Sequence, residues 1–175
     1  MINIINKVSE YNQGVSCEIG AIPIVLDFIE YCQMNHCGRY NKSWSCPPAI
    51  DSDFKKISSR FNKAYVINKV FQIADEFDIE GMDKALEQNN DMVYTIIKQL
   101  RANQIGFYLL KAGSCNLCSK CTYPDSPCVF PNMLYPPIEA FGIDVTALAS
   151  KLNMKYYNGK NTITYFTIIL YTQKE

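Results

Sequence analysis

The sequence lacks an excess of charge of either sign. Its 17 basic and 17 acidic residues cancel to a formal net charge of zero, and the Lys and Arg residues are scattered singly. Nucleic acid and anionic membrane surfaces attract proteins that carry clustered positive charge. We therefore expect neither as a partner.

Long hydrophobic runs are missing as well. No segment approaches the ~20 consecutive apolar residues that a membrane-spanning helix needs. Residues 1–7 (Met-Ile-Asn-Ile-Ile-Asn-Lys) also lack the basic start and long apolar stretch of a secretory signal peptide. We expect a cytoplasmic protein that is not associated with a membrane.

Two common kinds of catalytic machinery are absent from the sequence. It contains no Gly-x-Gly-x-x-Gly or Walker-type loop, so a nicotinamide or ATP site is not supported. His36 is the only histidine, which argues against a Ser-His-Asp triad.

Cysteine, by contrast, is abundant, with eight in 175 residues. Thiols in the cytosol are kept reduced, so this number is not explained by disulfides. Three of the cysteines also fall within seven residues, which makes them poor disulfide partners. The cysteines therefore indicate metal ligation in a reducing environment.

The densest group has the spacing Cys115-x2-Cys118-x2-Cys121-x6-Cys128. Four thiolates are the usual ligands of a cubane iron–sulfur cluster. Closely spaced cysteines also allow backbone N–H groups of the loop to point at the sulfurs, which stabilises the anionic cluster. We predict a [4Fe–4S] cluster at these cysteines, carrying single electrons to a redox partner protein or a small electron carrier.

A structural zinc site is the main alternative at this loop. Zinc also accepts four cysteines, but usually as two Cys-x2-Cys pairs separated by a dozen or more residues. Three cysteines crowded into one turn suit the corners of a cube better than a single tetrahedral ion. A loop that binds no metal is the third interpretation.

A second group, Cys32-x4-Cys37-x8-Cys46, lies earlier in the chain. With His36, Cys17 or an external molecule as a further ligand, it would hold a second metal or a second cluster. An incompletely liganded iron would be open to substrate, and the protein would then be a reductase-type enzyme. The alternative is that these are reduced thiols, with Cys17 a buried one and His36 an ordinary polar residue.

Several other side chains near the cysteines are candidates for a role. Glu139 and Asp144 would be proton donors beside a redox centre, although positions in the first turn and at the N-cap of helices explain them as well. Four aromatic residues are expected to shield the loops from water, with stacking on a substrate as the alternative. These are Tyr40, Trp44, Tyr123 and Tyr135.

The hydrophobic pattern predicts a single α+β (or α/β) domain over residues 1–175, with about four strands, helices packed on the sheet, and cysteine-rich loops at element ends. Helices are predicted over 21–35 (a strand is the alternative), from an N-cap at Asp51 to about 61, over 80–103, and after an N-cap at Asp144. Strands are predicted over 64–73 and 107–112. A hairpin around Asn158-Gly159 is predicted to pair 155–157 with 163–172.

Three segments, 32–48, 113–128 and 135–145, together resemble a known family in their motifs and order. It is the family of predicted metal-binding proteins called domain of unknown function 2284, common in anaerobic bacteria and archaea. The resemblance implies metal binding, in iron–sulfur form, through the Cys115 to Cys128 group, with the Cys32, Cys37 and Cys46 group as a second typical feature. It implies no settled reaction.

Two positions depart from the family pattern. Val129 stands where a basic residue often follows the fourth cysteine, and Asn41 stands where a glycine often follows the tyrosine. The first change alters the charge around a cluster, and neither removes a ligand.

Overall fold

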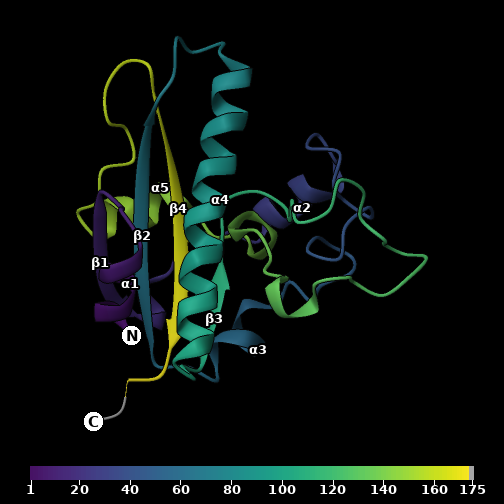
Figure 1. The fold of residues 1–175 in the computed structure, drawn as a ribbon, viewed down its shortest axis with the longest axis horizontal. Coiled ribbons are helices and arrows are strands. Elements are labelled where there is room, and N and C mark those ends of the chain that lie inside the picture. Colours follow the sequence, from purple (N-terminus) through teal and green to yellow (C-terminus); the bar gives the residue numbers. More distant parts are fainter. Residues whose placement is uncertain (174–175) are drawn as a thin grey trace.

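Four antiparallel strands form the centre of the structure, a computed structural model that describes residues 1–173. The strands follow the spatial order β1-β2-β4-β3, and helices lie on both sides of them (Figure 1). The fold is therefore α+β, as predicted. The strands are β1 (Gln13–Glu18), β2 (Lys63–Gln72), β3 (Phe107–Leu110) and β4 (Thr162–Tyr171).

Helices α1 and α4 pack against each other on one face of the sheet, and α3, α5 and the 3-10 helix η3 contribute to the core on the other face. Helix α2 lies beside η3. None of the helices in residues 1–173 is both long and apolar enough to span a bilayer. The helices are α1 (Ile2–Val8), η1 (Ile19–Ala21), α2 (Asp27–Gln33), α3 (Phe54–Ser58), α4 (Ile79–Ala102), η2 (Pro131–Met133), η3 (Ile138–Phe141) and α5 (Val145–Lys151).

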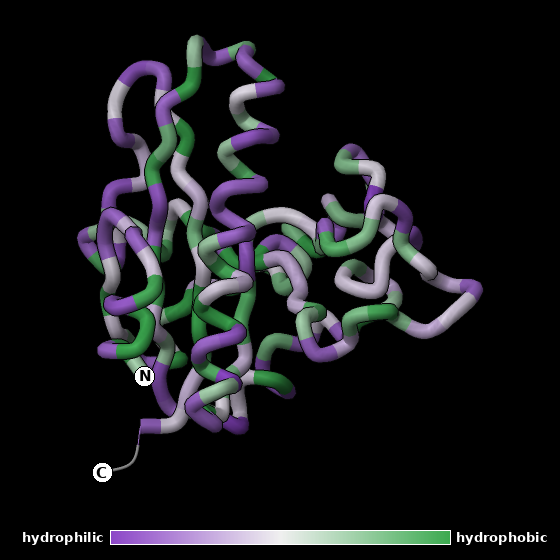
Figure 2. Tube along the Cα trace, viewed as in Figure 1, coloured by the Kyte–Doolittle hydropathy of each residue, from purple (hydrophilic) through white to green (hydrophobic). Residues whose placement is uncertain are grey.

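The alternation of side chains along β2 produces two hydrophobic cores. Ala64 and Val66 face η3 and α5, whereas Tyr65 and Ile67 face α4, because successive residues of a strand point to opposite faces. The apolar stripe of α4 fills the second core. Figure 2 shows hydrophobic residues concentrated where the strands and helices meet.

The predicted strand over 64–73 and the long helix over 80–103 are confirmed as β2 and α4. Asp78 caps α4 by accepting a hydrogen bond from the Gly81 N–H at 2.8 Å. Asp144 caps α5 as predicted, by accepting one from the Ala147 N–H. The strand predicted over 107–112 is also present, although β3 ends at Leu110.

The predicted N-cap at Asp51 is wrong. Asp51 accepts a hydrogen bond from the Asp53 N–H and pairs with Lys56, and Asp53 is the residue that caps α3. The helix also has five residues rather than three turns. Helix α2 is likewise shorter than predicted from 21–35, because Ile24 forms a β-bridge with Ile143 before the helix begins.

The predicted hairpin around Asn158-Gly159 is wrong as well. Residues 155–157 form no strand. Strand β4 pairs along its whole length with β2, and with β3 only over Ile168–Tyr171. Lys155 bonds instead to side chains of β1 and β2: its N–H donates to the Gln13 Oε1, and its carbonyl accepts from the Asn68 Nδ2. The short elements α1 and β1 were not predicted, since neither has a long periodic pattern.

Gly142 directly follows η3 and lies against the segment that precedes α2. Its φ of 66° lies in the left-handed region, where residues with a Cβ are strained. Its carbonyl accepts a hydrogen bond from the Val25 N–H at 2.7 Å, and the Asp144 N–H donates to the Pro23 carbonyl. These contacts hold α2 against η3, and with it the start of the first cysteine loop, residues 32–48, which is followed in the chain by the second, residues 113–128.

Replacing Gly142 by Ala is expected to lower the free energy of unfolding by about 2–4 kcal/mol. A Cβ there would strain the backbone and would lie 2.6 Å from the Val25 carbonyl oxygen. Gly106→Ala is the matched control, because its Cβ would meet nothing within 4 Å. Chemical denaturation of both variants measures the difference, and equal stability of the two would contradict this role of Gly142.

Candidate metal centre

The chain leaves β3 through a buried lysine. Lys111 is 0% exposed, and its Nζ donates to the Asn90 Oδ1 on α4 at 2.9 Å. The same amine donates to the carbonyls of residues 112, 113 and 114 at 3.2, 3.1 and 2.7 Å. A single side chain therefore fixes the three residues that immediately precede Cys115.

The Lys111 amine is buried, which is unusual for a lysine and shifts its pKa. Burial lowers its pKa to about 8, although the acidic groups of Cys115, Glu139 and Cys46 act in the opposite direction. The amine thus lies between α4 and the start of the second cysteine loop. Sequence reasoning missed this residue; the available signal was a lysine directly after the apolar run of β3.

The four cysteines of the second loop, Cys115, Cys118, Cys121 and Cys128, line one small cavity. All four are partly buried free thiols. Arg39 and Trp44 of the first loop complete the wall of this cavity. The structure thus brings the four predicted ligands to a common space at the place where the two loops meet.

Hydrogen-bond donors surround the Cys121 sulfur. Burial would raise the pKa of this thiol, but hydrogen bonds from the backbone N–H groups of Tyr123, Trp44 and Thr122 and from the Ser43 side chain outweigh it and lower the pKa. Donors of this kind stabilise a thiolate. Tyr123 and Thr122 belong to the same loop as Cys121, whereas Trp44 and Ser43 belong to the first loop.

Ser45 connects the two cysteine loops. Its hydroxyl accepts a hydrogen bond from the Cys115 N–H at 3.0 Å and lies 3.6 Å from the Cys46 sulfur. Ser45 is fully buried. This contact joins residues that are 70 positions apart in the sequence and places Cys46 beside the start of the second loop.

The four aromatic residues expected to shield the cysteine loops lie in different parts of the structure. Trp44 donates from Nε1 to the Ser126 carbonyl at 3.0 Å and packs edge-on against Tyr123, with ring centroids 4.8 Å apart. These two rings cover the second loop as expected. Tyr40 lines the cavity of the first loop. Tyr135, in contrast, is buried in the sheet core and lines neither cavity, so its expected position beside the cysteines is wrong.

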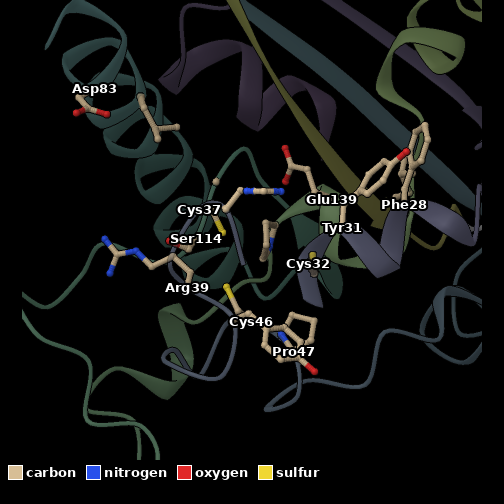
Figure 3. A pocket seen from close by; sticks show the side chains of 16 residues that line it. Phe28, Tyr31, Cys32, Cys37, Arg39, Cys46, Pro47, Asp83, Ser114 and Glu139 are labelled. Carbon is tan, nitrogen blue, oxygen red and sulfur yellow. The ribbon is translucent and has the colours of Figure 1, made fainter. Parts of the chain in front are cut away.

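Cys32, Cys37 and Cys46 line a second, larger cavity of about 690 Å³, together with His36. Figure 3 shows Cys37 and Cys46 around this space. Cys46 is buried, whereas Cys37 is exposed. Burial raises the pKa of both Cys32 and Cys46. The structure therefore brings the first group of cysteines together around a cavity of its own.

Glu139 also faces the large cavity, from the first turn of η3. Glu139 is exposed at this cavity, and desolvation by the surrounding protein raises the pKa of its carboxyl, against the influence of its own N–H group and of Lys111. Asp144 and Cys17 line neither cavity. Asp144 acts as the cap of α5, and Cys17 packs from β1 against the core.

The cysteines share cavities without being gathered around one point. Among residues 1–173, no group of three His, Cys, Asp or Glu side chains is placed to hold a single metal ion. The seven cysteines of the two loops thus divide into two sets, each lining its own cavity, with Arg39 contributing to both walls.

Comparison with known protein families gives a match over most of the chain. A family model described as "Predicted metal-binding protein (DUF2284)" matches residues 16–171, a range that contains all eight cysteines. No curated protein and no solved structure matches the chain.

Replacing Lys111 by Met is expected to lower the free energy of unfolding by about 2–3 kcal/mol, because three backbone carbonyls and Asn90 would lose their donor. Lys98→Met is the control, since Lys98 is exposed on α4. Denaturant titration of both variants tests the assignment. A Lys111→Met variant as stable as the control would show that these hydrogen bonds contribute little.

Proposed function

The chain belongs to the family of predicted metal-binding proteins, DUF2284, and we propose that it is an electron-transfer protein with a [4Fe–4S] cluster. The ligands are Cys115, Cys118, Cys121 and Cys128. The observation that carries the proposal is that these four free thiols line one cavity. When bound, such a cluster accepts and donates one electron at low potential.

Two features favour a cluster over a zinc ion. The tight spacing of Cys115, Cys118 and Cys121 differs from the paired knuckles of structural zinc sites. A tetrahedral zinc ion also draws four sulfurs to about 2.3 Å from one point, whereas a multi-iron core takes its thiolates at separate corners. Among residues 1–173, the four thiols line a common space without converging on one point, with about 20 Å³ of room between them.

The surroundings of the cavity suit an anionic centre. Backbone N–H groups donate to Cys121, and the amine of Lys111 lies at the base of the loop. Both stabilise negative charge on sulfur ligands. Because reduced thiols are needed to take up a cluster, the proposal includes a reducing cytoplasm and an oxygen-poor habitat.

The centre also lies near the surface. Val129 and Phe130 line the small cavity and are 58% and 44% exposed. An apolar surface next to the ligands offers a short path for electrons and a contact for a redox partner protein or a small carrier. Val129 leaves this contact uncharged.

Protein purified without oxygen is expected to be brown, to lose its colour on reduction with dithionite, and to contain about four irons per chain for one cluster. Cys118→Ala is expected to lose the colour and at least half of the iron. Cys17→Ala is the matched control, because Cys17 lines neither cavity, and it should keep both.

Metal analysis and absorption spectra of the unaltered chain, Cys118→Ala and Cys17→Ala test both the cluster and its ligands. A colourless protein with stoichiometric zinc would contradict the cluster proposal while leaving the metal-binding assignment intact. Equal iron in Cys118→Ala and the unaltered chain would contradict the assignment of the ligands.

A reductase-type enzyme is the second candidate. It is favoured by the position of Cys32, Cys37 and Cys46 on a cavity that is much roomier than the small one, where a partly liganded metal would be open to substrate. Cys37→Ala is expected to lower the iron content toward that of a single cluster if the first loop ligates iron. Unchanged iron in this variant would remove the second candidate and leave the first.

A further inference from the structure

The large cavity has the size of a small-molecule site. Its volume of about 690 Å³ lies within the roughly 300–1,000 Å³ that is typical of pockets for small organic ligands. Its walls come from α2, the first cysteine loop, α4, and the segment around η3. Parts of the chain that are distant in sequence therefore enclose one space (Figure 3).

The apolar part of the lining consists largely of flat surfaces. Phe28 and Tyr31 stack with ring centroids 5.7 Å apart. Tyr40, Pro47 and Pro137 add further flat faces to the cavity. Aromatic and proline faces favour a planar ligand, because such a ligand contacts them over its whole area.

Three charged side chains line the cavity, Arg39, Asp83 and Glu139. Neither of the two salt bridges in residues 1–173 involves Arg39 or Glu139. In Figure 3 the two side chains lie on different sides of the cavity, with Cys37 between them. A guanidinium group binds carboxylates through paired N–H groups, and a carboxyl group can exchange hydrogen bonds with a hydroxyl.

We propose that this cavity binds a small planar organic acid. Its flat body lies against Tyr31, Phe28 and the prolines, its carboxylate binds Arg39, and a polar group at its other end hydrogen-bonds to Glu139. The proposal rests on the geometry of the cavity and holds whichever metal the four cysteines of the second loop bind. It requires that Cys32, Cys37 and Cys46 hold no metal in this cavity.

The position of the cavity connects this ligand with the candidate metal centre. Arg39 lines both cavities, and the adjacent residues Ser114 and Cys115 line one each. The two cavities therefore share part of a wall. In the electron-transfer protein of the proposed function, the planar acid occupies the position of a small-molecule electron partner.

A set of three related compounds tests the site, using the full chain purified without oxygen. The probes are 6-hydroxy-2-naphthoate, which carries both polar groups, 2-naphthoate, which lacks the hydroxyl, and 2-naphthol, which lacks the carboxylate. Equilibrium dialysis is expected to show one saturable site for 6-hydroxy-2-naphthoate. Its Kd is expected to be roughly three- to tenfold lower than that of either truncated probe.

Single substitutions test which side chain binds the carboxylate of the probe and which binds its hydroxyl. Arg39→Gln is expected to weaken both acids roughly three- to tenfold and to leave 2-naphthol unchanged. Glu139→Leu is expected to weaken the hydroxyl-bearing acid and not 2-naphthoate. Tyr31→Ala, at an exposed position that tolerates change, should weaken all three probes, and Lys98→Gln on the exposed face of α4 should weaken none.

The proposal is overturned if no probe binds saturably at millimolar concentration. It is also overturned if Arg39→Gln weakens 2-naphthol as much as the acids, or if Lys98→Gln matches Arg39→Gln. Iron analysis of the same samples separates this result from the proposed function. Binding by an iron-free protein would contradict the cluster alone, and an iron-loaded protein without binding would contradict the ligand site alone.

Discussion

The candidate site depends on how the chain leaves β3. Lys111 is buried beneath α4 and donates to the three carbonyls that precede Cys115, and the Cys115 N–H then donates to Ser45 of the first loop. A buried amine needs acceptors, and carbonyls in an irregular turn need donors. The amine and the carbonyls satisfy each other's hydrogen-bonding needs. The Cys115 N–H is thereby placed where it meets Ser45, so the two cysteine loops come together.

This junction explains why the sheet and α4 act as a scaffold while the cysteines lie outside it. The sheet and α4 form a rigid base, and the chemistry-bearing residues lie on loops beyond it, an arrangement common in binding proteins. The junction also explains why two cavities are adjacent. Arg39 and the segment from Ser114 to Cys115 form a shared wall, with the four close-set cysteines on one side and the three widely spaced ones on the other.

Sequence patterns predicted the parts of the structure that depend on local signals. Helix α4 was predictable because its apolar stripe repeats over many turns, and β2 because β-branched and aromatic residues dominate it. The partners of β4 were not predictable, because strand pairing is set by contacts distant in sequence. The same holds at the site: Cys115 to Cys128 are close in the chain, whereas the contact from Ser45 and the role of Lys111 arise only in the folded protein.

The central claim is that the thiols of the second loop hold a core of several irons. X-ray absorption at the iron edge tests it most directly, on Cys37→Ala protein prepared without oxygen, so that the signal comes from the second loop alone. The account predicts a shell of sulfur neighbours together with a second shell of iron around each iron. Isolated iron with no iron neighbour, or an edge for zinc in place of iron, would contradict it.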